Sequence, residues 1–191
     1  MVECLFNGTE IHICVFSRNH YYPSESEYIS GVKVDLLPIE RPDPNIKIID
    51  EKYIELTSKA KFKPGIFEVL LVNKSNCITE ASKANVFFLI SGGVITPPSN
   101  KVLMGVTRKY AIEAMKNAGV MFEEKDVSVN DLSNYEGVFL TGTSLNLLPV
   151  SQVGELRFKT HENPVFLKLR NEFEEFERKY LAKKEVQIDK C

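Results

Sequence analysis

Several features that mark particular classes of protein are missing from this sequence of 191 residues. Lys and Arg together number 24 against 26 Asp and Glu, and no stretch concentrates the basic residues with aromatics, so a nucleic-acid-binding groove is not predicted. Apolar runs such as 69–72 and 86–90 are too short to span a bilayer, and the N-terminus lacks the basic and apolar regions of a signal peptide. We therefore expect a cytoplasmic protein with no nucleic-acid or membrane partner.

Cysteine and histidine are scarce and scattered. The four cysteines show no C-x-x-C spacing, and no ligand pattern accompanies the three histidines. Neither a disulfide framework nor a metal site is predicted, and the cysteines are expected to be reduced, buried thiols. These residues are Cys4, Cys14, Cys77, Cys191, His12, His20 and His161.

The sequence has enough apolar residues, 43%, for one well-packed domain or two small ones. Runs rich in β-branched and aromatic residues predict short strands, among them 11–16, 31–37, 67–72 and 138–140. With Gly92-Gly93 as a hairpin turn, the strands between 67 and 97 are expected to form a meander. Strands outnumber helices and do not alternate with them, which favours the α+β class.

Three helices are predicted from the spacing of apolar residues. The first begins near Ile49 and ends at Pro64-Gly65, the second follows Thr107 as its N-cap and stops at Gly119, and the third opens at Asn163-Pro164. The apolar face of the first helix is expected to be Ile49, Tyr53, Leu56 and Ala60. The stripe on the third helix is Phe166, Leu169, Phe173, Phe176 and Tyr180, for which packing in the core is favoured over an interface.

One carboxylate, Glu80, interrupts two strand-like runs between Cys77 and Phe88. Ionised carboxylates are rarely buried unless a cation or a strong donor meets them. Glu80 therefore either faces water at the end of a strand or has a positively charged partner.

Two loops have the composition of an anion-binding site. Gly105-Val106-Thr107 precedes a helix, where free N–H groups and a hydroxyl favour a phosphate. Thr141-Gly142-Thr143-Ser144 offers hydroxyls and a flexible backbone after a strand. Taken singly, each is also explained by ordinary structure: Thr107 as a helix N-cap, and 141–143 as a turn.

Together these segments resemble, in order and spacing, the class IV pyridoxal-phosphate enzymes, a family that includes the branched-chain and D-amino acid aminotransferases and aminodeoxychorismate lyase. The resemblance covers about residues 31 to 155. The four motifs are Ile78-Thr-Glu80-Ala-Ser82-x-x-Asn85-Val-Phe87, Ile95-Thr-Pro97, Leu103-x-Gly105-Val-Thr107-Arg108 and the run from Phe139 to Val150 with Thr141-Gly-Thr143.

The resemblance implies a fold and a function. Residues 26–191 would form the large cofactor-binding domain of the D-amino acid aminotransferase-like fold, and residues 1–25 would be a remnant of an N-terminal domain and its linker. The implied function is a homodimeric pyridoxal-phosphate-dependent aminotransferase acting on an amino acid and a 2-oxo acid, closer to the branched-chain and D-amino acid enzymes than to the lyase. The alternatives are a truncated, non-catalytic relative that binds the cofactor, or an aminodeoxychorismate lyase-like enzyme.

The resemblance also implies roles for individual residues. Lys47 takes the place of the Schiff-base lysine, Glu80 would bind the pyridine nitrogen, and Val106 and Thr107 would bind the phosphate. Thr143 would add a further cofactor contact. The Ser144 N–H would face the substrate carboxylate.

Two features of the sequence bear on the lysine. Lys59, Lys61 and Lys63 are nearer to Glu80 along the chain than Lys47 is, but they lie in or at the end of the predicted helix. Asp50-Glu51 stands where the family often has Asn-Tyr, whose phenol contacts the cofactor ring. If the assignment is right, Lys47, Glu80 and Thr107 must meet in one cavity.

Overall fold

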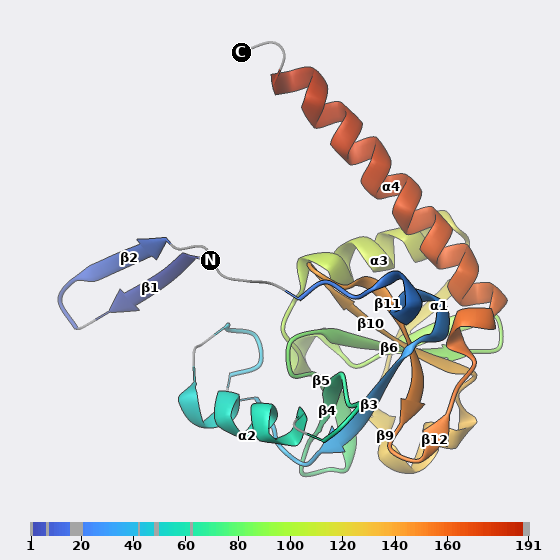
Figure 1. Cartoon of the computed structure of the whole chain (residues 1–191), viewed down its shortest axis with the longest axis horizontal. Helices are drawn as coiled ribbons and strands as arrows, with labels where there is room; N and C mark the ends of the chain where they lie inside the picture. Colours follow the sequence, from blue (N-terminus) through green and yellow to red (C-terminus); the bar gives the residue numbers. More distant parts are fainter. Residues whose placement is uncertain are drawn as a thin grey trace.

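Ten strands form one mixed sheet, accompanied by four α-helices, in a computed structural model of the chain (Figure 1). The structure describes residues 2–6, 8–15, 21–41, 43–47, 50–61 and 63–188, with side chains outside 2–6 and 183–188. Across these residues strands outnumber helices and do not alternate with them one for one, so the α+β class is confirmed.

The bounds of the elements agree with most of the predicted segments. The strands are β1 (Val2–Phe6), β2 (Ile11–Val15), β3 (Val32–Leu37), β4 (Glu68–Val72), β5 (Cys77–Ala81), β6 (Asn85–Ile90), β7 (Gly93–Thr96), β8 (Met121–Glu124), β9 (Val127–Ser128), β10 (Gly137–Gly142), β11 (Asn146–Val153) and β12 (Leu156–Arg157). The α-helices are α1 (Glu25–Ser30), α2 (Glu51–Lys61), α3 (Val106–Asn117) and α4 (Pro164–Ile188). Short 3-10 turns are η1 (Ser99–Lys101), η2 (Val129–Asn134) and η3 (Thr160–Glu162).

The strand order in the sheet is β8-β7-β6-β10-β11-β3-β4-β5-β9, with β12 paired to β11. Adjacent strands in the chain form antiparallel hairpins at β4–β5, β6–β7 and β10–β11, whereas β3 runs parallel to both β4 and β11. The expected meander is wrong at one step, because β5 pairs with β9 and β6 pairs with β10. A tight turn, closed by the Ala81 N–H donating to the Ala84 carbonyl at 2.8 Å, separates β5 from β6.

The sheet buries apolar side chains on both faces. Along β6, Val86 and Phe88 contribute to one cluster and Phe87 and Leu89 to another. The second cluster lies under α3 and α4, where Phe87 stacks on Phe139 of β10 with ring centroids 5.0 Å apart. Strands covered on both faces are apolar throughout, which is why β4, β6 and β10 appear in the sequence as short unbroken runs.

Two predicted helix features are wrong. Leu56 is 39% exposed, and the buried residues of α2 are instead Tyr53 and Thr57. Gly105, not Thr107, is the N-cap of α3, and no side chain caps that helix. Thr107 is therefore in the first turn of α3, where its side chain is buried. Ile49 lies outside the described residues.

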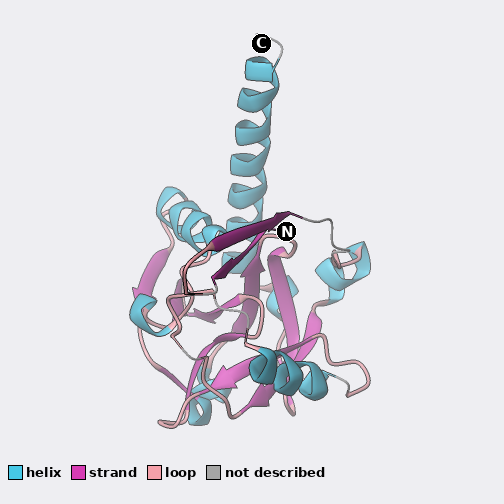
Figure 2. Cartoon of the chain, turned by 90° about the vertical axis from the view of Figure 1, so that its left-hand side faces the viewer, coloured by secondary structure: helices cyan, strands magenta, loops and turns pink. Residues whose placement is uncertain are grey.

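Both ends of the chain extend away from the sheet (Figures 1 and 2). The side chains of β2, residues 11–15, are all exposed on the two-stranded β1–β2 hairpin. Helix α4 packs on the domain through Phe166, Leu169 and Phe173 and then projects beyond it, so Tyr180 is 46% exposed. The expected core packing of this stripe is confirmed for its first half and wrong at Tyr180. No helix among the described residues is long and apolar enough to cross a membrane.

The expectation of buried thiols is wrong for the two cysteines whose side chains are described. Cys14 is exposed on β2 and Cys77 is partly exposed at the start of β5, and both are free thiols. The side chain of Cys4 and residue Cys191 lie outside the described part of the chain.

Candidate functional site

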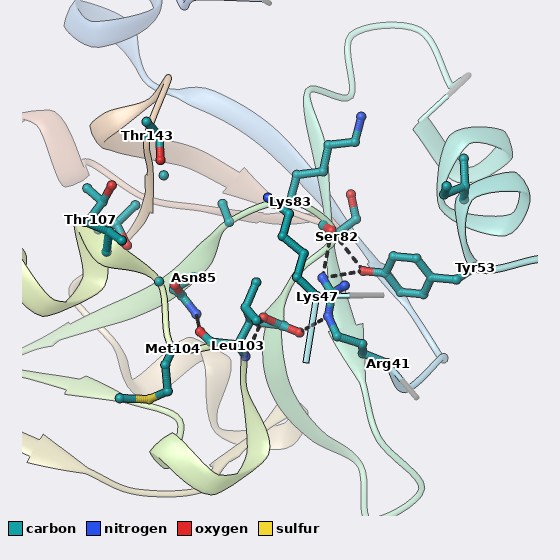
Figure 3. Close-up of a pocket in the computed structure, with 17 residues that line it drawn as sticks. Arg41, Lys47, Tyr53, Ser82, Lys83, Asn85, Leu103, Met104, Thr107 and Thr143 are labelled. Atoms are coloured by element: carbon teal, nitrogen blue, oxygen red, sulfur yellow. Dashed lines mark hydrogen bonds and ion pairs between the residues drawn. The ribbon is translucent and has the colours of Figure 1, made fainter. Parts of the chain in front are cut away.

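A cavity of about 550 Å³ opens beside the ends of β5 and β10 and the N-terminus of α3 (Figure 3). Its walls come from the β3–α2 loop, the first turn of α2, residues 80–85, residues 103–107 and residues 141–143. Five residues predicted from the sequence line it together, which meets the expectation that Lys47, Glu80 and Thr107 share one cavity. Those five are Lys47, Glu80, Val106, Thr107 and Thr143. Ser144 is half-buried in the turn after β10 and is not among the described residues that line the cavity.

Glu80 is buried at 2% exposure on the cavity wall, so the alternative of an exposed strand end is wrong. Its partner is Arg41 from the β3–α2 loop, whose Nε lies 2.6 Å from Glu80 Oε1. The backbone N–H of Leu103 donates to the other oxygen, Oε2, at 3.1 Å. The cation that the buried carboxylate requires is thus supplied by the protein itself.

The electrostatics of Glu80 reflect opposing effects. Burial raises the pKa of Glu80 above its ordinary value, while the hydrogen bond and charge of Arg41 and the Leu103 N–H act to lower it. A carboxylate has about four lone-pair sites, and two described donors occupy Glu80. The group therefore keeps capacity to accept another N–H donor from within the cavity.

The N-terminus of α3 forms the opposite wall of the cavity. Val106 and Thr107 lie in its first turn, with Val106 67% exposed and Thr107 buried. Asn85 fixes the preceding turn, because its amide donates to the Leu103 carbonyl at 2.8 Å. A Cβ at Gly105 would clash with the Asn85 side-chain oxygen, so a larger residue here would displace the amide that holds the Leu103 carbonyl. A helix end without a side-chain cap presents N–H groups and a positive dipole, which favour an anion.

The third wall is the end of β10. Thr141 is buried and its hydroxyl has no hydrogen-bond partner among the described residues, although buried hydroxyls nearly always have one. Thr143 begins the turn into β11 and is exposed to the cavity. The segment predicted as a loop from Thr141 onward is therefore strand up to Gly142.

Two lysines, Lys47 and Lys83, line the cavity (Figure 3). Both are exposed, and neither makes an ion pair within the part of the chain that is described. The three lysines compared with Lys47 in the sequence are all engaged elsewhere: Lys59 with Glu55, Lys61 with Glu68 and Lys63 with Asp35. Lys83 is thus the stronger structural rival of Lys47, and the sequence motifs did not single it out.

Tyr53 brings a phenol to the wall next to Arg41. Its hydroxyl donates to the Ser82 carbonyl at 2.9 Å and accepts from Arg41 Nη2 at 3.1 Å, and the guanidinium carbon lies 4.7 Å from the ring centroid. Burial raises the pKa of Tyr53, so the phenol keeps its proton and acts as a donor. Asp50 accepts the Tyr53 backbone N–H at 2.7 Å, as an N-capping residue does, which accounts for an acidic residue at this place in the sequence.

Sequence patterns missed Arg41 as the partner of Glu80 and Lys83 as a cavity residue. A general signal was available, since a buried acid requires a cation, but it does not identify Arg41 among the cationic residues. Lys83 sits between two motif residues, Ser82 and Asn85, and no periodicity distinguishes it from a solvated lysine.

Comparison with known proteins places the chain in a family. A family model described as amino-transferase class IV matches residues 6–153. A probable branched-chain-amino-acid aminotransferase from Thermotoga maritima is 32% identical over 154 residues, which cover 77% of this chain and 56% of the relative. The crystal structure of a putative branched-chain amino acid aminotransferase from Thermotoga maritima matches with a TM-score of 0.73 and 29% identity, over 82% of this chain and 57% of that one.

A further solved structure, an aminotransferase from Brucella abortus bound to the cofactor PLP, matches with a TM-score of 0.70 over 86% of this chain and 58% of that one. At 23% identity it supports the shared fold. The chain spans about half the length of the curated relatives it matches. The resemblance seen in the four sequence motifs is confirmed, since the matched region exceeds half of the sequence: the chain belongs to the amino-transferase class IV family.

Proposed function

We propose that this chain carries the cofactor site of a pyridoxal-phosphate-dependent aminotransferase. The observation that carries the proposal is the meeting of Lys47, Glu80 and the N-terminus of α3 in one cavity, from three segments far apart in sequence. The amine of Lys47 suits the aldehyde of this cofactor, and the buried carboxylate of Glu80 suits its ring nitrogen. The uncapped N-terminus of α3 suits its phosphate.

Three observations on the cavity residues themselves support their fit to this cofactor. Within the described part of the chain, the buried Thr141 hydroxyl has no hydrogen-bond partner, Glu80 keeps acceptor capacity, and no side chain caps α3. When bound, pyridoxal phosphate would supply an electron sink for chemistry at the α-carbon of an amino acid. In the proposal, Val106 and Thr107 bind the phosphate through N–H groups and a hydroxyl, with Thr143 adding a contact.

The remaining proposed roles are the transfer of a proton and the stabilisation of charge. Glu80, oriented by Arg41 and the Leu103 N–H, accepts the ring N–H and keeps that nitrogen protonated. Lys47 would be the lysine that holds the cofactor, and its amine would move the substrate α-proton. The N–H of Ser144 remains a proposed contact for the substrate carboxylate.

The substrate and assembly are finer parts of the proposal. Relatives named as branched-chain-amino-acid aminotransferases support an amino acid of the branched-chain class and its 2-oxo acid as substrates. We assign residues 26–191 to the cofactor-binding domain and residues 1–25 to an N-terminal domain remnant and linker, and the protein to a cytoplasmic homodimer.

The test is covalent trapping of the cofactor. The purified chain is incubated with pyridoxal phosphate, its visible spectrum is recorded, and borohydride reduction followed by peptide mass spectrometry locates the label. We expect a yellow protein, loss of the colour on reduction, and the label on Lys47. Lys47→Ala should abolish the label, whereas Lys59→Ala, a lysine paired with Glu55 on the exposed face of α2, should leave it unchanged.

Other outcomes separate the alternatives. A colourless wild-type chain at excess cofactor contradicts the proposed function. A label that stays with Lys47→Ala and disappears with Lys83→Ala would move the role to Lys83. Colour without any exchange of an amino group, measured by conversion of the bound cofactor to its amine form, would favour the non-catalytic relative.

A further inference from the structure

A buried polar network continues from the cavity wall to the far end of α2. Glu68, the first residue of β4, is 4% exposed and does not line the cavity. Its Oε1 accepts the Ser82 hydroxyl at 2.6 Å and the Val69 N–H at 2.8 Å. Lys61, the last residue of α2, lies 2.8 Å from the same oxygen. A carboxylate this buried requires the cation and the donors that surround it.

Ser82 connects this ion pair to the cavity. Its N–H donates to the Val69 carbonyl at 3.1 Å and its hydroxyl donates to Glu68, so two contacts fix its orientation from the β4 side. Its carbonyl then accepts both Tyr53 Oη, at 2.9 Å, and Arg41 Nη2, at 3.1 Å. Arg41 in turn holds Glu80.

Helix α2 touches the network at both ends. Tyr53, Thr57 and Lys61 follow each other at intervals of four residues and so share one face of the helix. Tyr53 bonds to Ser82 directly, and Lys61 bonds to it through Glu68. Moving the Tyr53 end of α2 would change a donor to the Ser82 carbonyl, and moving the Lys61 end would change the ion pair of the carboxylate that accepts the Ser82 hydroxyl.

We propose that the Lys61–Glu68 ion pair is a positioning element of the cofactor cavity, acting through Ser82 to hold Arg41 and Tyr53 beside Glu80. The inference rests on the proposed function, because the benefit of a fixed Glu80 is its contact with the cofactor ring. Neither Lys61 nor Glu68 lines the cavity, so the path by which they position its residues is the set of hydrogen bonds described above.

Two variants test the connection at different points. Ser82→Ala removes the hydroxyl that donates to Glu68 and leaves the carbonyl in place. Glu68→Gln retains an oxygen acceptor but removes the charge that pairs with Lys61. The matched control is Glu55→Gln, which breaks the exposed Lys59–Glu55 pair on the same helix.

Three quantities are measured for each purified protein: the dissociation constant for pyridoxal phosphate, the wavelength and pH profile of the visible band, and the melting temperature. Ser82→Ala and Glu68→Gln should each weaken binding about five-fold or more, as loss of one partner in a buried network does. Their visible band should also shift, since it reports the ring nitrogen. The control should match the wild type in all three measurements.

A purely structural role for the ion pair would lower the melting temperature and leave the dissociation constant and visible band of the folded protein at wild-type values. That result overturns the inference. If Glu68→Gln does not fold, the result for Ser82→Ala decides by the same criterion.

A readout without cofactor separates this inference from the proposed function. Amide hydrogen exchange at Leu103, whose N–H donates to Glu80, is compared in unloaded wild type and Ser82→Ala. Faster exchange in the variant supports the positioning role even if the wild-type chain binds no cofactor, a result that would contradict the proposed function alone. Unchanged exchange together with unchanged binding overturns the positioning role.

Discussion

Two helices flank the candidate cofactor cavity, and they are attached to the sheet in opposite ways. Helix α3 buries Ala111, Ala114 and Met115 against the second apolar cluster. Helix α2 packs Tyr53 and Ala60 into a small apolar cluster with Val69 and Leu71, and hydrogen bonds and ion pairs add to this attachment. Helix α3 is thus held mainly by a large apolar cluster, and α2 by a small cluster together with directional polar contacts.

The difference has consequences for the cavity. Apolar packing is non-directional and depends on how well side chains fill space, so α3 presents its N-terminus from a rigid base. Polar contacts depend on the charge and orientation of each partner, so the place of α2 depends on a few groups near the cavity. Stability should therefore be most sensitive to changes under α3, and cofactor binding to changes under α2.

The largest expected effect on stability comes from Met115→Ala. Met115 is fully buried on the inner face of α3, and truncation leaves a cavity, so the free energy of unfolding should fall by about 3 kcal/mol. Urea denaturation measures this change. The dissociation constant for pyridoxal phosphate, measured where the variant is folded, should stay within about two-fold of the wild type, because Met115 packs in the apolar cluster and is not among the residues that line the cavity. A loss below about 1 kcal/mol, or a large loss of affinity, would remove the contrast between the two helices.

Tyr53→Phe should have a smaller effect on stability and a larger one on binding. It leaves the ring in place but removes the hydroxyl that bonds to Ser82 and Arg41, at an expected cost of about 1–2 kcal/mol in the free energy of unfolding. Because Arg41 then loses one of its fixed partners beside Glu80, the affinity for pyridoxal phosphate should fall as well. Thr57→Val, on the same face of α2 but away from Arg41, is the control, and equal affinity loss in both variants would count against a specific role for the phenol.

The same contrast governs what the sequence could predict. The apolar face of α3 and its end at Gly119 followed from spacing, because the contacts that hold the helix are apolar and periodic. For α2, the spacing of apolar residues predicted that Leu56 lies on the buried face, but Leu56 is 39% exposed. Thr57 and Lys61 face inward instead, and polar anchors of this kind are invisible to hydrophobic periodicity.

Site residues that belong to a sequence motif could be predicted, whereas contacts between residues far apart in the sequence could not. The order of the motifs predicted that Lys47, Glu80 and Thr107 meet in one cavity. The spacing of the motifs could not identify the cation that pairs with Glu80. Arg41 and Glu80 are 39 positions apart and meet only because the β3–α2 loop passes over the end of β5. Residue chemistry required a cation at Glu80, and only the fold identifies which one.

The smallest expected effect concerns a polar contact at the other end of α2. Lys63, just after the helix, pairs with Asp35 of β3, and its hydrogen bond lowers the pKa of Asp35 while burial opposes the shift. A lowered pKa in the folded state means that the contribution to stability is present above the unfolded pKa of about 4 and is lost as the pH falls through the lower folded value.

Lys63 is 66% exposed, so solvent screens the pair and Asp35→Asn should cost at most about 0.5 kcal/mol at pH 7. Urea denaturation of wild type and variant at pH 7 and near pH 3 measures the difference, which should shrink toward zero at the lower pH. Glu55→Gln, in a pair exposed on both sides, should show a smaller difference at either pH. If the loss of unfolding free energy in Asp35→Asn grows on acidification, Asp35 supports α2 through its neutral form. If that loss is comparable to the loss in Tyr53→Phe, the polar attachment of α2 extends well beyond the cavity side.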